Sequence, residues 1–275
     1  MNMKYEIFKS NATLYEHSAE NVEILDSYFD NNFGLSLLKS NNFGAISGIL
    51  LSPWHGRSHC LTSKLGDLWI IIKGTGCPYM PNPYTPTQCM NGSKWGMLDR
   101  KDAEKEFEIM KQVAEFKTET SIPLALKKII HPSFAPYLIY YGLKNPYRLI
   151  DLDFMNQNDK KLVRENIFRD NCGRFNSTHL IATYKISKTL KRLYDKGLIH
   201  NSLSTHNITC ALELLDFEAS IQVLNSNYSS QTLNNLVLRE MIQLREIAYQ
   251  IAWWFNEDFN SDLVEELVKE TKVKF

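Results

Sequence analysis

Residues 197–220 read GLIHNSLSTHNITCALELLDFEAS, and this stretch decides the fold expected for the chain. His200 is followed seven positions later by Asn207, and the apolar run ALELL leads into Asp216 and Phe217. An Asn amide oxygen and an Asp carboxylate are hard ligands of the kind that Mg²⁺ prefers. On adjacent turns they can hold a cation that bridges the phosphates of a nucleotide. We therefore expect Asn207 and Asp216 to bind Mg²⁺ or Mn²⁺.

This spacing is that of the protein-kinase catalytic loop, H-R-D-L-x-x-x-N, followed by D-F-G. Leu203 matches the leucine of the loop, and Asp216-Phe217-Glu218 stands where D-F-G belongs. The position of the catalytic base is Ser202. A neutral hydroxyl cannot take up a proton near pH 7 as a carboxylate can. The stretch therefore indicates a kinase-like loop without the usual base.

The segments flanking this loop are predicted to be helical. Apolar residues recur there at three- and four-residue spacing. The expected helices cover 177–197, 233–256 and 262–270. The run IAWWF at 251–255 is expected to lie in the core, and any part of it that is exposed would mark a partner surface.

The first half of the chain is predicted to be rich in strands. Strands are expected at 43–52 and 65–74, and two more within 135–154, broken at Asn145-Pro146. A loop rich in glycine and proline is expected at 73–96, and a helix at 99–117. The order of these elements predicts an α+β, bilobal, protein-kinase-like fold. Its β-rich N-lobe with one main helix would cover 1–143, and a reduced helical C-lobe 144–275.

A kinase-like site also needs a lysine on an N-lobe strand that pairs with a glutamate on the helix of that lobe. Lys73 ends the apolar run WIIIK. The helix offers Glu104, Glu106 and Glu108, and we favour Glu106 because it precedes Phe107, an anchor on the apolar face. Lys73 and Glu106 are therefore predicted to form the pair.

Residues 65–220, roughly, resemble the selenoprotein O family of kinase-like protein adenylyltransferases. In that family the loop reads H-G-V-x-N-T-D-N, also without a catalytic Asp, and here it reads HNSLSTHN. The K-G-x-G motif of the family is matched by KGTGCPY at 73–79, and its R-E-F before I-P by KEF at 105–107 before SIPLAL. GRF at 173–175 resembles its Arg-Phe pair.

The resemblance implies roles for individual residues. Lys73, Gly74, Gly76 and Arg174 would contact ATP, with Arg169 and Arg164 as further phosphate candidates. Where the family has Asp before the Asn, this chain has His206, and its imidazole titrates in the range that suits a base. Together with Lys73 and Glu106, His206 is thus a candidate for the chemistry.

Composition narrows the class of protein. The 275 residues carry 31 basic and 31 acidic side chains, so no global field favours nucleic acid or an anionic membrane. Five cysteines without a CxxC pair argue against a disulfide framework and against structural zinc. No signal peptide or membrane span is visible. A cytoplasmic protein is expected, and an exported effector with a non-classical signal would look the same.

Three functions fit these observations. The first is an enzyme that uses ATP and Mg²⁺ or Mn²⁺ to transfer AMP or phosphate to a protein or small-molecule acceptor. The second is a pseudokinase scaffold, favoured by Ser202, by Glu218 in place of glycine and by the lack of a G-x-G-x-x-G loop. The third is a small-molecule phosphotransferase, whose loop would normally carry H-x-D.

Overall fold

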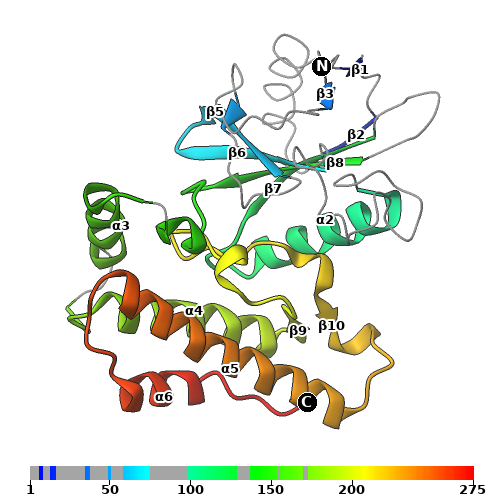
Figure 1. Ribbon diagram of the computed structural model, residues 1–275. Coiled ribbons are helices and arrows are strands. Elements are labelled where there is room, and N and C mark those ends of the chain that lie inside the picture. The colour runs from blue at the N-terminus through cyan, green and yellow to red at the C-terminus, as the bar shows by residue number, and fades with distance from the viewer. Residues whose placement is uncertain are drawn as a thin grey trace, which may run out of the picture. The chain divides into compact units, whose positions relative to one another are not determined.

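The computed structural model describes residues 6–8, 13–16, 35–37, 49–50, 58–74, 98–128, 137–153, 155–169 and 173–275. The chain divides into two compact units (Figure 1). The first unit comprises Met1–Lys111 and Ser121–Pro146, and the second Gln112–Thr120 and Tyr147–Phe275.

The first unit contains a six-stranded antiparallel sheet with the order β2-β7-β8-β6-β5-β4. These strands are β2 (Thr13–Glu16), β4 (Ile49–Leu50), β5 (Ser58–Leu65), β6 (Leu68–Lys73), β7 (Ile122–Lys128) and β8 (Tyr137–Leu143). Strands β1 (Glu6–Phe8) and β3 (Leu35–Leu37) form a separate pair. Every residue of β8 and the last four of β6 are buried, so these two adjacent strands form the middle of the sheet.

Helix α2 (Arg100–Glu115) confirms the helix predicted at 99–117. The Asp99 carboxylate accepts a hydrogen bond of 2.8 Å from the Asp102 amide, which satisfies a donor that the first helical turn leaves unpaired. Ala103 and Phe107 are buried on the apolar face, as the three- and four-residue spacing requires.

The second unit is mostly helical. Helices α4 (Thr178–Asp195), α5 (Ser230–Trp254) and α6 (Ser261–Lys269) confirm the three helices predicted from the sequence. Helix α4 packs against α5, α6 and α3, and α5 packs against α6 (Figure 1). Helix α3 (Gln157–Arg169) was not predicted because it buries only Val163 and Ile167, so its sequence carries too short an apolar pattern.

Short elements shape the chain between α4 and α5. Strands β9 (Leu198–Ile199) and β10 (Ile221–Gln222) pair antiparallel and close the loop between them. The 3₁₀ turns of this region are η2 (Thr205–Asn207), η3 (Phe217–Ala219) and η4 (Val223–Asn225). The pairing of β9 with β10 brings residues 200 and 220 close together, so the quoted stretch is one compact loop structure.

Two strand predictions have different outcomes. The strand predicted at 65–74 is confirmed as β6, whereas the strand expected after Pro146 is wrong. There the chain forms the 3₁₀ helix η1 (Leu149–Asp153), whose turn is fixed by an Arg148 amide that donates to the Asp151 carboxylate at 2.7 Å. Of 43–52 only β4 is described, and the loop predicted at 73–96 lies outside the described residues beyond Gly74.

The described residues confirm the α+β class, with five α-helices and small antiparallel sheets. Strands β5 and β7 were not predicted, because the apolar alternation of SHCLTSKL and IPLALKK is interrupted by polar residues and a proline. Among the described helices, none has the length and apolar character needed to cross a bilayer.

Candidate functional site

A buried ion pair joins strand β6 to helix α2 in the first unit. Lys73 Nζ lies 2.8 Å from Glu106 Oε1 and 2.7 Å from Glu106 Oε2. Both residues are almost fully buried, at 4% and 1% exposure. The contact predicted from the sequence is thus present, and among the three candidate glutamates it is Glu106 that makes it. Glu104 and Glu108 bond instead to Arg100 and Lys111.

Gly74 follows Lys73 for a reason of backbone geometry. Its φ is +97°, and a Cβ at this position would lie 2.5 Å from the Tyr137 carbonyl oxygen. Glycine is therefore the residue that allows β6 to end against β8 at this point. A role for Gly74 in binding ATP stays a prediction, and Gly76 lies outside the described residues.

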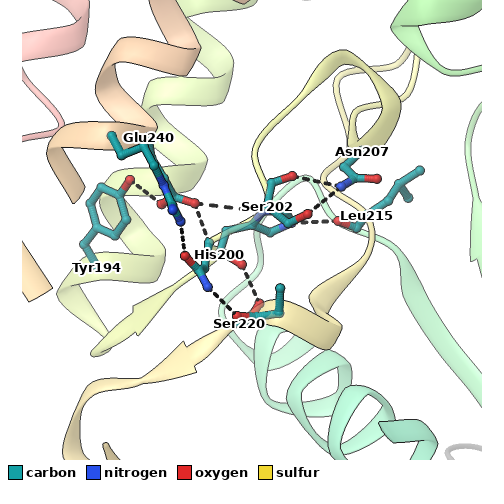
Figure 2. A network of polar contacts seen from close by, with 10 residues as sticks. Tyr194, His200, Ser202, Asn207, Leu215, Ser220 and Glu240 are labelled. Atoms are coloured by element: carbon teal, nitrogen blue, oxygen red, sulfur yellow. Dashed lines mark hydrogen bonds and ion pairs between the residues drawn. The ribbon is translucent and has the colours of Figure 1, made fainter. Parts of the chain in front are cut away.

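In the second unit, His200 holds the two halves of the quoted stretch together. Its buried Nε2 lies 2.6 Å from the Leu215 carbonyl oxygen and must donate, because a carbonyl can only accept. The ring meets Phe217 edge to face, with centroids 5.0 Å apart. In return, Ser220 Oγ donates to the His200 carbonyl at 3.0 Å. The segment around Asp216 is thereby fixed against the loop that begins at His200 (Figure 2).

Asn207 lies at the other end of this loop, with its amide group oriented by Ser202. Its Nδ2 donates to both the carbonyl oxygen and Oγ of Ser202, each at 2.8 Å. Figure 2 shows the amide oxygen directed away from Ser202. The Leu215 amide donates to the Asn207 carbonyl at 2.9 Å, so Asn207 lies beside the residue that precedes Asp216. An oxygen of the predicted type is thus available next to the segment that carries the second predicted ligand.

Asp216 adopts an unusual backbone conformation. It is half-buried, and its φ of 62° and ψ of 67° place it in the left-handed region. This region costs a residue other than glycine about 1 kcal/mol or more, and Asp is among the residues that tolerate it best. Such strain occurs often where a side chain is held for function. The donor set of Asn207 and Asp216 fits a hard divalent cation.

Sequence reasoning missed Glu240 of α5, whose carboxylate is hydrogen-bonded to the loop that begins at His200. Its fully buried carboxylate accepts hydrogen bonds from the Tyr194 hydroxyl at 2.7 Å and from the Asn201 amide at 2.5 Å. One oxygen also lies 4.0 Å from His200 Nδ1. Burial raises the pKa of Glu240, and the charge of His200 and the two hydrogen bonds oppose the rise. A usable signal existed, because Glu240 falls on the apolar face of its helix, where an acid needs partners.

His206 is exposed and lies in the turn η2. Arg148 Nη1 donates to the His206 carbonyl at 2.8 Å and so fixes the turn that carries the ring. Partial burial lowers the pKa of His206, the charge of Arg148 lowers it further, and Asp151 opposes this change. The imidazole therefore favours its neutral form, and its role as a base stays a prediction.

The three arginines proposed for phosphate binding have other contacts. Arg174 is exposed and stacks on Tyr184, with its guanidinium carbon 4.2 Å from the ring centroid. Arg164 lies 3.4 Å from the Glu257 carboxylate, and Arg169 donates to Asn166 at 2.9 Å. In the described part of the chain, none of these contacts joins an arginine to Asn207 or Asp216.

The fold and these contacts define an α+β protein with a compact loop structure between His200 and Ser220 and a buried Lys–Glu pair. No protein-family model matches the chain, and no curated protein matches it either.

Proposed function

We propose that the chain is a kinase-like transferase that binds ATP with Mg²⁺ or Mn²⁺ and transfers AMP or phosphate to an acceptor. Its two units would correspond to the N-lobe and the reduced C-lobe of a bilobal protein-kinase-like fold. The observation that carries the proposal is the buried pair of Lys73 and Glu106. A buried ion pair is weak support for stability, because desolvation offsets much of the attraction. The burial of this pair is better explained by a lysine that must be held in position for phosphate.

Each residue would have one task. Lys73 would neutralise phosphate charge, Glu106 would orient Lys73, and Asn207 and Asp216 would hold the metal. A bound cation supplies charge neutralisation at the phosphates. His206, next to Asn207 and exposed, would be the group that receives a proton from the acceptor. Because such transfers depend mainly on positioning and electrostatics, the replacement of the usual Asp by Ser202 is compatible with activity.

A scaffold without catalysis is the second candidate, and one contact favours it. Ser202 bonds to the Asn207 amide group and so fills the base position with a residue that cannot accept a proton near pH 7. In a scaffold of this kind, the loop would have the shape of a kinase catalytic loop without its catalytic function. Nucleotide binding separates the two candidates, because a pure scaffold has no need of a metal-dependent ATP site.

Thermal unfolding of the full chain with ATP, with and without Mg²⁺ or Mn²⁺, tests the proposal. A ligand at about 100 times its Kd stabilises the folded state by about 2.7 kcal/mol, so Tm should rise by several degrees. The rise should require the metal and should vanish in Asp216→Ala and in Asp216→Asn, which tolerates the left-handed backbone. Asp258→Ala, which removes an exposed carboxylate elsewhere in the second unit, is the matched control and should keep it.

The two transfer reactions are then distinguished by the position of the label. Label from the α-phosphate of ATP appears on the acceptor only if AMP is transferred, and label from the γ-phosphate only if phosphate is transferred. The absence of any Tm rise at millimolar ATP with metal would reject the transferase and leave the scaffold.

A further inference from the structure

Helix α5 exposes a row of large apolar side chains in the second unit. Leu238, Ile242, Tyr249 and Trp253 are all exposed, and Tyr249 and Trp253 reach 59% and 65%. With 100° per residue, these four positions fall within about 60° of one face of the helix. Their neighbours Ile251, Ala252 and Trp254 are buried, so only part of the IAWWF run enters the core. An exposed apolar row of this kind marks an interaction surface.

A groove lies beside this row, where α5 and α6 pack together. Its volume is about 630 Å³, and its lining residues include Tyr249, Phe259, Glu246 and Asp262. The Tyr249 and Phe259 rings meet edge to face, with centroids 5.4 Å apart at 80°. Phe259 is supported from behind by the buried His179, with ring centroids 5.6 Å apart. The aromatic part of the groove is thus held in place before any partner arrives.

The charges of the groove are predominantly negative. Arg245, its one lining cation, is bonded to Glu265 through Nε at 2.5 Å and Nη2 at 2.9 Å. Glu246 and Asp262 make no ion pair with any described residue, so two carboxylates flank the rings. Asp262 lies in the first turn of α6, where an acidic side chain is favoured. Residues 230–270 as a whole carry eight acidic and three basic side chains, although the full chain has 31 of each.

We propose that this α5–α6 groove binds a basic amphipathic segment of a protein partner, with an arginine of that segment placed on the Tyr249 and Phe259 rings. A guanidinium stacks on aromatic faces and pairs with carboxylates, which is the combination that this groove presents. The apolar row of Leu238, Ile242 and Trp253 would receive the apolar face of the same segment. The proposal is independent of nucleotide binding.

The test uses the full chain and a fluorescein-labelled synthetic peptide of about 15 residues, with leucines at helical spacing and arginines on both flanks. Fluorescence anisotropy gives its Kd for the wild type and two double variants. Glu246→Gln/Asp262→Asn removes the two groove carboxylates. Asp258→Asn/Glu266→Gln removes the same charge from exposed positions that do not line the groove.

We expect the groove variant to bind the peptide about tenfold more weakly than the matched control, which should bind like the wild type. Tyr249→Ala should weaken binding too, and circular dichroism checks that each variant is folded. Equal Kd values for the two double variants would overturn the proposal. So would equally tight binding of a peptide with glutamates in place of its arginines. Self-association of the chain through this face, seen by sedimentation and lost in Tyr249→Ala, would replace the peptide by a second copy.

Discussion

Glu106 and Glu240 are two carboxylates that are buried almost completely, yet their surroundings differ. Glu106 faces a full positive charge, because Lys73 Nζ lies within 2.8 Å of both of its oxygens. Glu240 accepts hydrogen bonds from neutral donors, the Tyr194 hydroxyl and the Asn201 amide, and His200 Nδ1 lies 4.0 Å from it. The first arrangement pairs the carboxylate with a buried lysine, and the second fixes the backbone of a loop.

The different partners of Glu106 and Glu240 predict how each acid responds when a partner is removed or the pH is changed. A buried charge that loses its partner cannot be rehydrated, so breaking an ion pair from one side is costly. A buried acid with neutral donors can take up a proton instead, which is the direction in which burial moves the pKa of Glu240. Removal of single partners and a change of pH should therefore separate the two sites.

The largest effect is expected when the ion pair is broken from one side. Lys73→Met leaves the Glu106 carboxylate buried without its cation, and the free energy of unfolding should fall by about 3–5 kcal/mol. The double variant Lys73→Met/Glu106→Leu replaces both charges by apolar groups and should recover most of this loss. Urea unfolding measures the wild type, the two single variants Lys73→Met and Glu106→Leu, and the double variant. If the double variant were as unstable as the sum of the single ones, the two residues would not act as a pair.

A smaller effect is expected at Glu240. Glu240→Ala leaves the Tyr194 hydroxyl and the Asn201 amide without their acceptor and should cost about 2–3 kcal/mol. Glu240→Gln keeps an acceptor oxygen and should cost less. Because Asn201 belongs to the loop, its amide hydrogen should exchange faster in Glu240→Ala, while the core of α4 keeps its protection. Unchanged exchange at Asn201 would mean that Glu240 does not anchor the loop.

These two sites also differ in how far the sequence predicts them. Lys73 and Glu106 could be paired because each has a local signal, an apolar strand before Lys73 and an anchoring Phe107 after Glu106. The partners of Glu240 are Tyr194 and Asn201, and Asn201 is 39 residues away along the chain. No local period predicts that contact, because it depends on the packing of α4 against α5.

Dependence on the packing between elements also explains which parts of the fold the sequence does not predict. The helices with a continuous apolar face were predicted within a few residues, whereas α3, with two buried residues, was not. The partial exposure of IAWWF depends on which faces of α5 are covered by α4 and α6. The orientation of the Asn207 amide is set by Ser202, whose role the sequence pattern presented only as a missing base.

The smallest of the three effects is expected at Glu257, a carboxylate that is only half-buried. Burial alone would raise its pKa, but hydrogen bonds from His179 and Thr178 at the N-terminus of α4 lower it to about 2, below the usual 4.5. Between about pH 2 and pH 4.5, the folded protein binds fewer protons at Glu257 than the unfolded protein does. The stabilisation that Glu257 contributes to the folded state is therefore complete above pH 4.5 and is lost as the pH falls toward 2. Glu240 has the opposite sign, because a raised pKa makes stability fall as the pH rises above 4.5.

Two amide variants test this contrast. Glu257→Gln keeps the side-chain shape but removes the charge at the start of α4, so it should lower the free energy of unfolding by about 1 kcal/mol at neutral pH. Urea unfolding from pH 2.5 to 7 gives the free energy of unfolding of each protein. The wild type should lose its greater stability relative to Glu257→Gln only as the pH falls below about 4.5. The difference in free energy of unfolding between the wild type and Glu240→Gln should change only above about pH 4.5, because the raised pKa of Glu240 places the ionisation of this carboxyl there. Parallel curves for all three proteins would show that neither carboxylate changes its proton affinity on folding.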